Sequence, residues 1–91
     1  MVILTNEDPY DEDPRHIIDD MVRGMQRTPE IIVDRREAIR RALERAHAGD
    51  AVLISGKGTD PFIMGAHGTK VPWSDARVAR EELDAVLTAR L

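Results

Sequence analysis

Three continuous apolar runs, each followed by a segment with helical spacing, constrain the fold of this chain most strongly. Strands that alternate with helices of about 10–15 residues form parallel sheets with right-handed crossovers. Because the runs are apolar throughout, both faces of the sheet are expected to be covered. We therefore predict an α/β fold: a three-layer, Rossmann-like parallel sheet of about three strands with three helices and at least one open edge. The predicted strands are residues 2–5, 30–33 and 51–55.

Each predicted helix begins at a residue that can cap it. Asp13 precedes a proline, which suits the first helical position. Asp34 is followed three residues later by Glu37, as in a capping box. Ser74 caps the last helix, and residues 62–72 before it are expected to form a short hairpin or an ordered loop.

The composition excludes several classes of function. The 91 residues carry 13 Lys and Arg against 17 Asp and Glu, a net charge of −4, so no nucleic-acid partner is expected. Cysteine is absent, which removes disulfides, thiolate nucleophiles and cysteine zinc sites. No apolar run reaches the roughly 20 residues that span a bilayer, and no signal-peptide pattern follows Met1. We therefore expect no membrane partner and a cytoplasmic location.

Ligand-binding residues are expected in the loops that follow the strands, because open α/β sheets bind ligands beyond the carboxyl ends of their strands. The loop over residues 6–13 carries five acids, and the loop over residues 56–61 carries two glycines, a lysine and an acid. Such a mixture suits a small zwitterion such as an amino acid: acids hold the ammonium group, and backbone N–H groups or a cation hold the carboxylate. The alternative is that these residues are helix caps and solvated surface.

No catalytic or metal-binding constellation is visible in the sequence. Residues 56–59 read Gly-Lys-Gly-Thr, but they lack the glycine five positions before the Gly-Lys pair that a phosphate loop needs, so they predict a tight turn. The three histidines, His16, His47 and His67, are not spaced as metal ligands and are expected on the surface. We therefore predict no catalytic residue and no metal site in this chain.

Four segments match, in order and in spacing, the motifs of one family. Residues 2–14 correspond to T-S-D-N-P-R-x-E-D-P, residues 34–39 to D-R-x-x-A-I, residues 55–60 to G-K-G-H-E, and residues 73–80 to F-[SD]-D-x-x-x-A-R. The chain thereby resembles the Mur ligases of the UDP-N-acetylmuramoyl-tripeptide synthetase type, and the resemblance covers nearly its whole length.

The resemblance implies an ATP-dependent amino-acid ligase of peptidoglycan synthesis, of which residues 1–91 are one partial C-terminal, amino-acid-binding domain. The family's UDP-sugar-binding part and its phosphate loop have no counterpart here, so the chain alone is expected to be inactive. ATP and magnesium are then cofactors of the full-length enzyme, and this chain has none of its own. The implied partners are an amino acid and either the rest of the ligase or a second copy of the chain. The alternative is a stand-alone α/β interaction or structural domain that kept the fold without ligand binding.

The resemblance also assigns substrate-binding residues. Tyr10 stands where the family has the arginine that grips the distal carboxylate of meso-diaminopimelate, so that bidentate contact is lost. Glu7 and Asp8 replace an aspartate and an asparagine, and Asp60 replaces a glutamate, which leaves the pocket acidic. A ligand with a cationic end, such as lysine, is thus favoured over diaminopimelate. The predicted substrate-binding residues are Glu7, Asp8, Pro9, Tyr10, Gly56 and Asp60.

Overall fold

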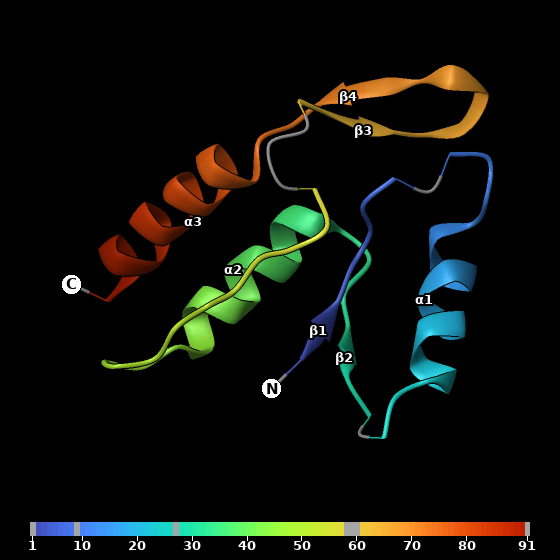
Figure 1. Ribbon diagram of the computed structural model, residues 1–91. Coiled ribbons are helices and arrows are strands. Elements are labelled where there is room, and N and C mark those ends of the chain that lie inside the picture. The colour runs from blue at the N-terminus through green and yellow to red at the C-terminus, as the bar shows by residue number, and fades with distance from the viewer. Residues whose placement is uncertain (1, 9, 27, 58–60, 91) are drawn as a thin grey trace.

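The computed structural model of the chain describes residues 2–8, 10–26, 28–57 and 61–90, and it has the α/β architecture that the sequence predicts (Figure 1). Strands and helices alternate over the first half, and a small hairpin precedes the last helix. In chain order the elements are β1 (Ile3–Leu4), α1 (Pro14–Arg23), β2 (Glu30–Ile31), α2 (Arg35–Arg45), β3 (Phe62–Met64), a 3₁₀ turn (Ala66–Gly68), β4 (Lys70–Pro72) and α3 (Asp75–Ala89).

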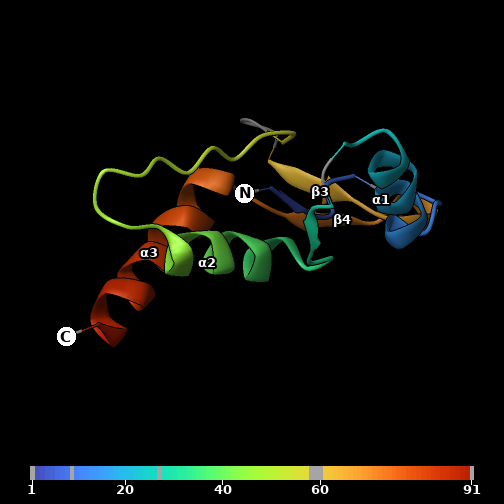
Figure 2. The same ribbon diagram turned by 90° about the horizontal axis from the view of Figure 1, so that it is seen from below.

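β1 and β2 form a parallel pair, as expected for strands joined by a crossing helix. Leu4 pairs with Ile31, and the Asn6 amide donates to the Val33 carbonyl at 3.2 Å, so the pairing extends toward the carboxyl ends of both strands. α1 and α2 lie on opposite sides of this pair in both views (Figures 1 and 2). The predicted layers of helix, sheet and helix are therefore present, around a parallel pair of two described strands.

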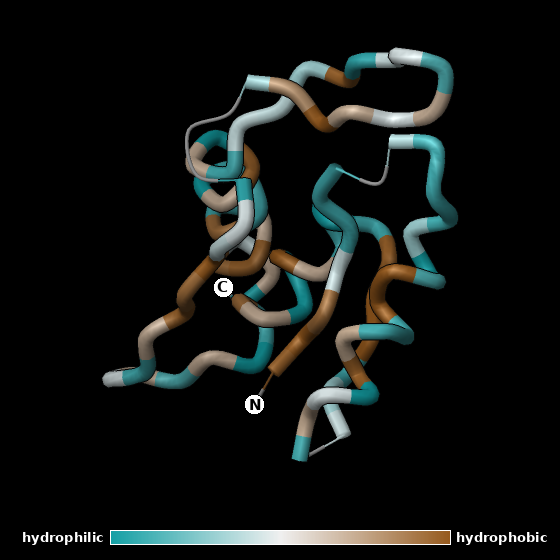
Figure 3. Tube along the Cα trace, turned by 45° about the vertical axis from the view of Figure 1, so that its right-hand side comes forward, coloured by the Kyte–Doolittle hydropathy of each residue, from teal (hydrophilic) through white to brown (hydrophobic). Residues whose placement is uncertain are grey.

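Residues 51–55, predicted as the third strand, form no strand. They pass in front of α2 in the view of Figure 1, and a groove of about 780 Å³ is lined by this segment, α2 and β1. Among the described residues no backbone hydrogen bond joins this segment to β1, and Leu53 is 91% exposed. Figure 3 shows the hydrophobic residues of β1 and of this segment on two separate stretches of the chain. The prediction is wrong because a strand needs a neighbouring strand that pairs with its backbone N–H and C=O groups, and among the described residues no backbone–backbone hydrogen bond reaches this apolar run.

The hairpin and the three helix caps are confirmed. β3 and β4 pair in antiparallel fashion, with Ile63 opposite Val71. The side chains of Asp13, Asp34 and Ser74 accept hydrogen bonds from backbone N–H groups in the first turn of the helix that follows, at 2.9, 2.9 and 3.1 Å. Because each such cap stabilises a helix by about 1 kcal/mol, local sequence determines where these helices begin.

α3 packs along α2 (Figure 1), and the two helices are joined by ion pairs at their solvent-facing side. Arg36 of α2 donates to Glu81 and to Glu82 of α3, both at 3.0 Å. The hydrogen bond from Arg36 to Glu81 raises the pKa of Arg36 against the effect of burial. The buried apolar side chains are aliphatic, as the scarcity of aromatic residues requires: Leu4, Ile18, Ala38, Ile39, Val78 and Val86.

Candidate functional site

Two loops meet at the carboxyl end of β1. We call residues 6–13 the β1 loop and residues 55–57 the glycine turn. The carboxylate of Glu7 in the β1 loop lies directly against Gly56, because a Cβ atom at position 56 would be 1.9 Å from Glu7 Oε2. Gly56 also has a φ of +106°, which residues with a side chain rarely adopt. The backbone conformation therefore favours glycine at position 56, and the absence of a side chain there leaves room for the Glu7 carboxylate.

An ion pair joins the same two loops. Lys57 Nζ donates to both carboxylate oxygens of Asp8 at 2.8 Å, and the Met64 amide donates to Asp8 Oδ1 at 2.8 Å. Lys57 is only 3% exposed. Burial by itself raises the pKa of Asp8, but the hydrogen bonds from Lys57 and from the Met64 amide outweigh burial and hold this pKa below its usual value. Asp8 is therefore ionised and engaged by protein groups, whereas Glu7 beside it is exposed.

Tyr10 lies farther along the β1 loop, where the loop contacts the β3–β4 hairpin. It is 56% exposed, has a φ of +52°, and its amide donates to the Met64 carbonyl at 3.2 Å. Asp11 Oδ1 accepts a hydrogen bond at 2.8 Å from a backbone amide in the hairpin turn. These contacts seat the β1 loop on the hairpin. Two further residues predicted to bind substrate, Pro9 and Asp60, lie outside the described residues.

Arg35 lies beneath both loops. It is the first residue of α2 and is 5% exposed. Its Nη1 donates to the carbonyl of Asn6 at 3.3 Å, and its Nη2 donates to the carbonyl of Ser55 at 3.0 Å. One guanidinium group therefore contacts the starting residue of each loop.

The guanidinium of Arg35 is held in turn by the first residue of α3. Arg35 Nε and Nη2 donate to the two carboxylate oxygens of Asp75, each at 2.8 Å, and Trp73 Nε1 donates to Asp75 Oδ1 at 2.7 Å. Burial raises the pKa of Asp75, but the hydrogen bonds from Arg35 and Trp73 outweigh it, so this pKa lies below its usual value. Asp75 is thus a buried carboxylate that stays ionised.

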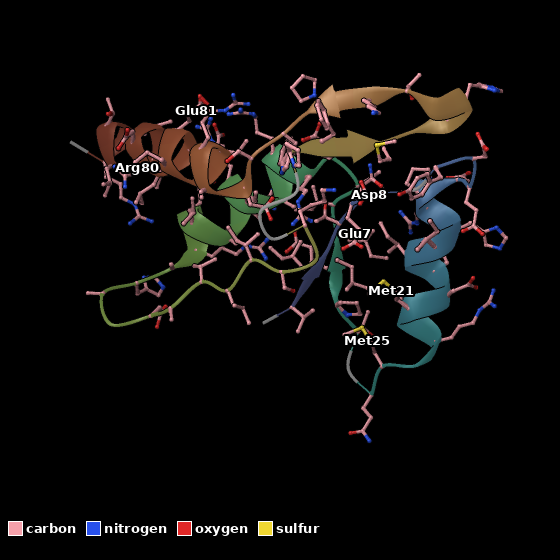
Figure 4. The ribbon with its side chains drawn as sticks, turned by 45° about the horizontal axis from the view of Figure 1, so that its top comes forward. Glu7, Asp8, Met21, Met25, Arg80 and Glu81 are labelled. Carbon is pink, nitrogen blue, oxygen red and sulfur yellow. The ribbon has the colours of Figure 1, made fainter. Side chains whose placement is uncertain are left out.

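A cavity of about 280 Å³ opens beside the two loops. Its size is near the lower end of the range for small-molecule pockets, roughly 300 Å³, and suits a ligand as small as an amino acid. Figure 4 shows Glu7 and Asp8 at one side of this region, with Met21 on the side of α1. The polar and apolar residues that line it include Glu7, Asp8, Gly56, Arg35, Ile17 and Met21.

Arg35 and Asp75 have no predicted role, and Lys57 is predicted only as a cation that could hold a substrate carboxylate, yet these three residues organise the site, with Lys57 paired to Asp8. Lys57 and Asp8 could have been paired from their opposite charges in loops that follow two predicted strands. Arg35 and Asp75 both lie within motifs that the family resemblance matched, at the start of a predicted helix in each case. Charged residues at such positions, directly after a cap, were the available signal.

The described part of the chain contains no group of three or more His, Asp or Glu side chains arranged to hold a metal ion. Within the same residues, each helix is too short or too polar to cross a membrane.

A two-stranded parallel unit with loops that converge beside a small pocket is typical of ligand-binding α/β domains. Comparison with known proteins makes the class specific. Residues 1–58 match the family described as "Mur ligase, glutamate ligase domain", and the chain therefore belongs to the Mur ligase family.

Two relatives and one solved structure carry the same name. The chain is 41% identical over 85 residues to UDP-N-acetylmuramoyl-L-alanyl-D-glutamate--2,6-diaminopimelate ligase of Aquifex aeolicus, and 44% identical over 85 residues to that of Chlorobaculum tepidum. The matches cover 91% and 92% of this chain but only 17% and 16% of those proteins. A solved structure of a ligase with the same name superposes with a TM-score of 0.82 at 39% identity, over 92% of this chain and 18% of that one. The family-level resemblance seen in the sequence is thus confirmed.

Proposed function

We propose that this chain is the amino-acid-presenting part of the C-terminal domain of a UDP-N-acetylmuramoyl-tripeptide synthetase-like ligase. Such an enzyme joins an amino acid to a UDP-N-acetylmuramoyl peptide with ATP, in the cytoplasmic steps of peptidoglycan synthesis. The observation that carries the proposal is the meeting of Glu7 with Gly56, because the family resemblance gives substrate recognition to both loops. The relatives' names support an amino acid of the diaminopimelate class as the ligand.

Within the proposed site, Glu7 faces the amino group or the distal cationic group of the substrate. Asp8 is already neutralised by Lys57, so we assign the substrate's positive charge to Glu7, together with Asp60 by resemblance. Backbone N–H groups of the glycine turn are assigned to the substrate carboxylate, because successive backbone N–H groups in a turn can bind an anion.

ATP and magnesium are assigned to other parts of the ligase. Residues 56–59 lack the spacing of a phosphate loop, and no cluster of metal ligands lies among the described residues. We assign the reaction steps that use ATP to those parts as well, and to this chain the binding and orientation of the amino acid.

Titration of the 91-residue chain with amino acids tests the proposal. Lysine is expected to shift the backbone amide resonances of Glu7, Asp8 and Gly56 in nuclear magnetic resonance spectra, because its ammonium groups meet the exposed carboxylate. Glu7→Gln keeps the shape of the side chain and removes its charge, so affinity for lysine should fall by about 1–3 kcal/mol. If neither lysine nor diaminopimelate shifts these amides, the chain is a scaffold that kept the fold without its ligand.

The identity of residue 10 should set the preference between lysine and diaminopimelate. Tyr10→Arg places a guanidinium fork on an exposed part of the β1 loop, where it can form a bidentate contact with a distal carboxylate. We expect the variant to gain affinity for diaminopimelate about tenfold relative to lysine. Tyr10→Lys is the control, since it adds the same charge without the fork; equal gains in both variants would contradict the expectation.

The rest of the ligase is the partner that we assign to the groove between β1 and residues 51–55. The Leu4 carbonyl accepts a hydrogen bond at 3.0 Å from the Ile32 amide, directly after β2, so by alternation the backbone groups of Ile3 point away from β2 and toward the groove. The groove is also lined by Ala38 and Ile39 of α2. An extended aliphatic strand satisfies both the open backbone edge and the apolar lining. The curated relatives are long enough to supply one, because this chain spans only 17% of the first of them.

Without that partner, the 91-residue chain is expected to self-associate or to be marginally stable, because β1 keeps an open edge and Leu53 stays exposed. Light scattering should show a mass that rises with concentration, and Leu53→Ser should reduce this rise. Leu87→Ser is the matched control, as an exposed leucine of α3 away from the groove. A monomer at high concentration with a melting temperature above about 80 °C would contradict the expectation.

A further inference from the structure

We infer that Arg35 is a positioning residue of the proposed amino-acid site, which holds the β1 loop and the glycine turn at a fixed separation. The expected effect on ligand binding rests on the proposed function, whereas the contacts of Arg35 do not depend on it. Asn6 precedes Glu7 and Ser55 precedes Gly56 in the chain. The guanidinium of Arg35 therefore holds, at 3.3 and 3.0 Å, the last carbonyl before each residue that the site uses.

The direction of this guanidinium is fixed from α3. Arg35 meets Asp75 through two parallel hydrogen bonds of 2.8 Å, and such a bidentate pair sets the plane of the guanidinium as well as its position. Trp73 Nε1, at 2.7 Å from Asp75 Oδ1, holds the carboxylate in place. The remaining N–H groups of Arg35 are thereby aimed at the two loops.

Among the described residues no backbone hydrogen bond joins residues 51–57 to residues 2–8. The ion pair between Asp8 and Lys57 ties the loops farther from the sheet, beyond Glu7 and Gly56. Arg35 thus links the two loops through the residues that directly precede Glu7 and Gly56.

Only arginine suits this position. A lysine ammonium is a single charged point with three donors, so it cannot present a two-pronged face to Asp75 and also reach two backbone carbonyls. Arg35→Lys keeps the positive charge beside Asp75 and is expected to release at least one loop. The separation of Glu7 and Gly56 would then vary, so the two residues would no longer be held in one arrangement for a ligand.

Arg35→Lys in the 91-residue chain, with Arg36→Lys as its matched control, tests the inference. Arg36 is the next residue along α2 and also pairs with carboxylates of α3, which lie away from both loops. We expect Arg35→Lys to shift the amide resonances of both Glu7 and Gly56 in the absence of ligand and to weaken lysine binding about tenfold. Arg36→Lys should lower the melting temperature while leaving these resonances and the affinity unchanged.

The two readouts separate the inference from the proposed function. If Arg35→Lys moves both loop amides but the wild-type chain binds no amino acid, the positioning role stands and the proposed function fails. If Arg35→Lys behaves like Arg36→Lys, with a change in melting temperature only, the positioning role is overturned. Should Arg35→Lys fail to fold, Trp73→Phe keeps an aromatic ring, although a smaller one, and removes the hydrogen bond to Asp75. It should shift the same two amides by a smaller amount; no shift in either loop would again overturn the inference.

Discussion

Asp75→Asn is expected to lower the free energy of unfolding by about 3–5 kcal/mol. The side chains of Arg35 and Asp75 are 4% and 11% exposed, so their charges compensate each other away from water. The amide introduced by the substitution would keep the size of the carboxylate and could still accept from Trp73, but it would leave the guanidinium without a counter-charge. The loss arises from that uncompensated buried charge. Urea unfolding followed by circular dichroism measures it.

Glu81→Gln is the control for this variant. Glu81 pairs with Arg36, but both side chains are nearly half exposed, so the loss should stay below about 1 kcal/mol. If the Asp75 and Glu81 variants lost the same amount, the Arg35–Asp75 pair would not be the stabilising contact that its burial indicates.

The same pair makes the stability of the fold depend on pH. The folded-state pKa of Asp75 lies below the usual 3.8, because the hydrogen bonds from Arg35 and Trp73 outweigh burial. A carboxyl group with a lowered folded-state pKa contributes stability that is complete above its unfolded value and is lost as the pH falls through the folded value. The free energy of unfolding should therefore fall on acidification below about pH 4, and it should fall less steeply in Asp75→Asn. Identical pH profiles for the two proteins would contradict this assignment.

Local sequence determines the parts of this fold that could be predicted. The caps at Asp13, Asp34 and Ser74 and the hairpin at residues 62–72 depend on interactions within a few residues, and all are observed. The strand predicted at residues 51–55 would depend on a neighbouring strand from elsewhere in the chain. Its apolar composition indicates a β-strand, but the described residues offer no backbone at hydrogen-bonding distance.

The candidate site also has one part that the sequence predicts and another that depends on contacts between distant residues. Glu7 and Gly56 both follow predicted strands, so their loops are expected to lie at the same edge of the sheet. The structure brings the two residues into contact. The pairing of Lys57 with Asp8 spans 49 residues and that of Arg35 with Asp75 spans 40, so neither can be found from spacing within one element. The sequence supplied the charged groups of the site, but tertiary packing decides which acid is neutralised by the protein and which stays exposed.

Gly56→Ala is expected to remove amino-acid binding at a small cost in stability. A Cβ atom at this position would overlap Glu7 Oε2, and since that oxygen is the end of a flexible side chain, Glu7 can move away. The energetic cost is then mainly the positive φ, about 1–2 kcal/mol for a residue with a side chain. The displaced carboxylate no longer faces the ligand, so affinity for lysine should fall at least about tenfold.

Gly49→Ala separates the effect of the Glu7–Gly56 contact from the effect of the positive φ. Gly49 has a φ of +91°, close to that of Gly56, but nothing among the described residues lies within 4 Å of the position its Cβ would take. The two variants should therefore lose similar free energies of unfolding, while only Gly56→Ala shifts the Glu7 amide and loses lysine binding. Calorimetric titration and thermal unfolding of the pair measure the two quantities separately. Equal binding by both variants would show that the approach of Glu7 to Gly56 plays no part in holding the ligand, and the proposed site would have to lie elsewhere on the β1 loop.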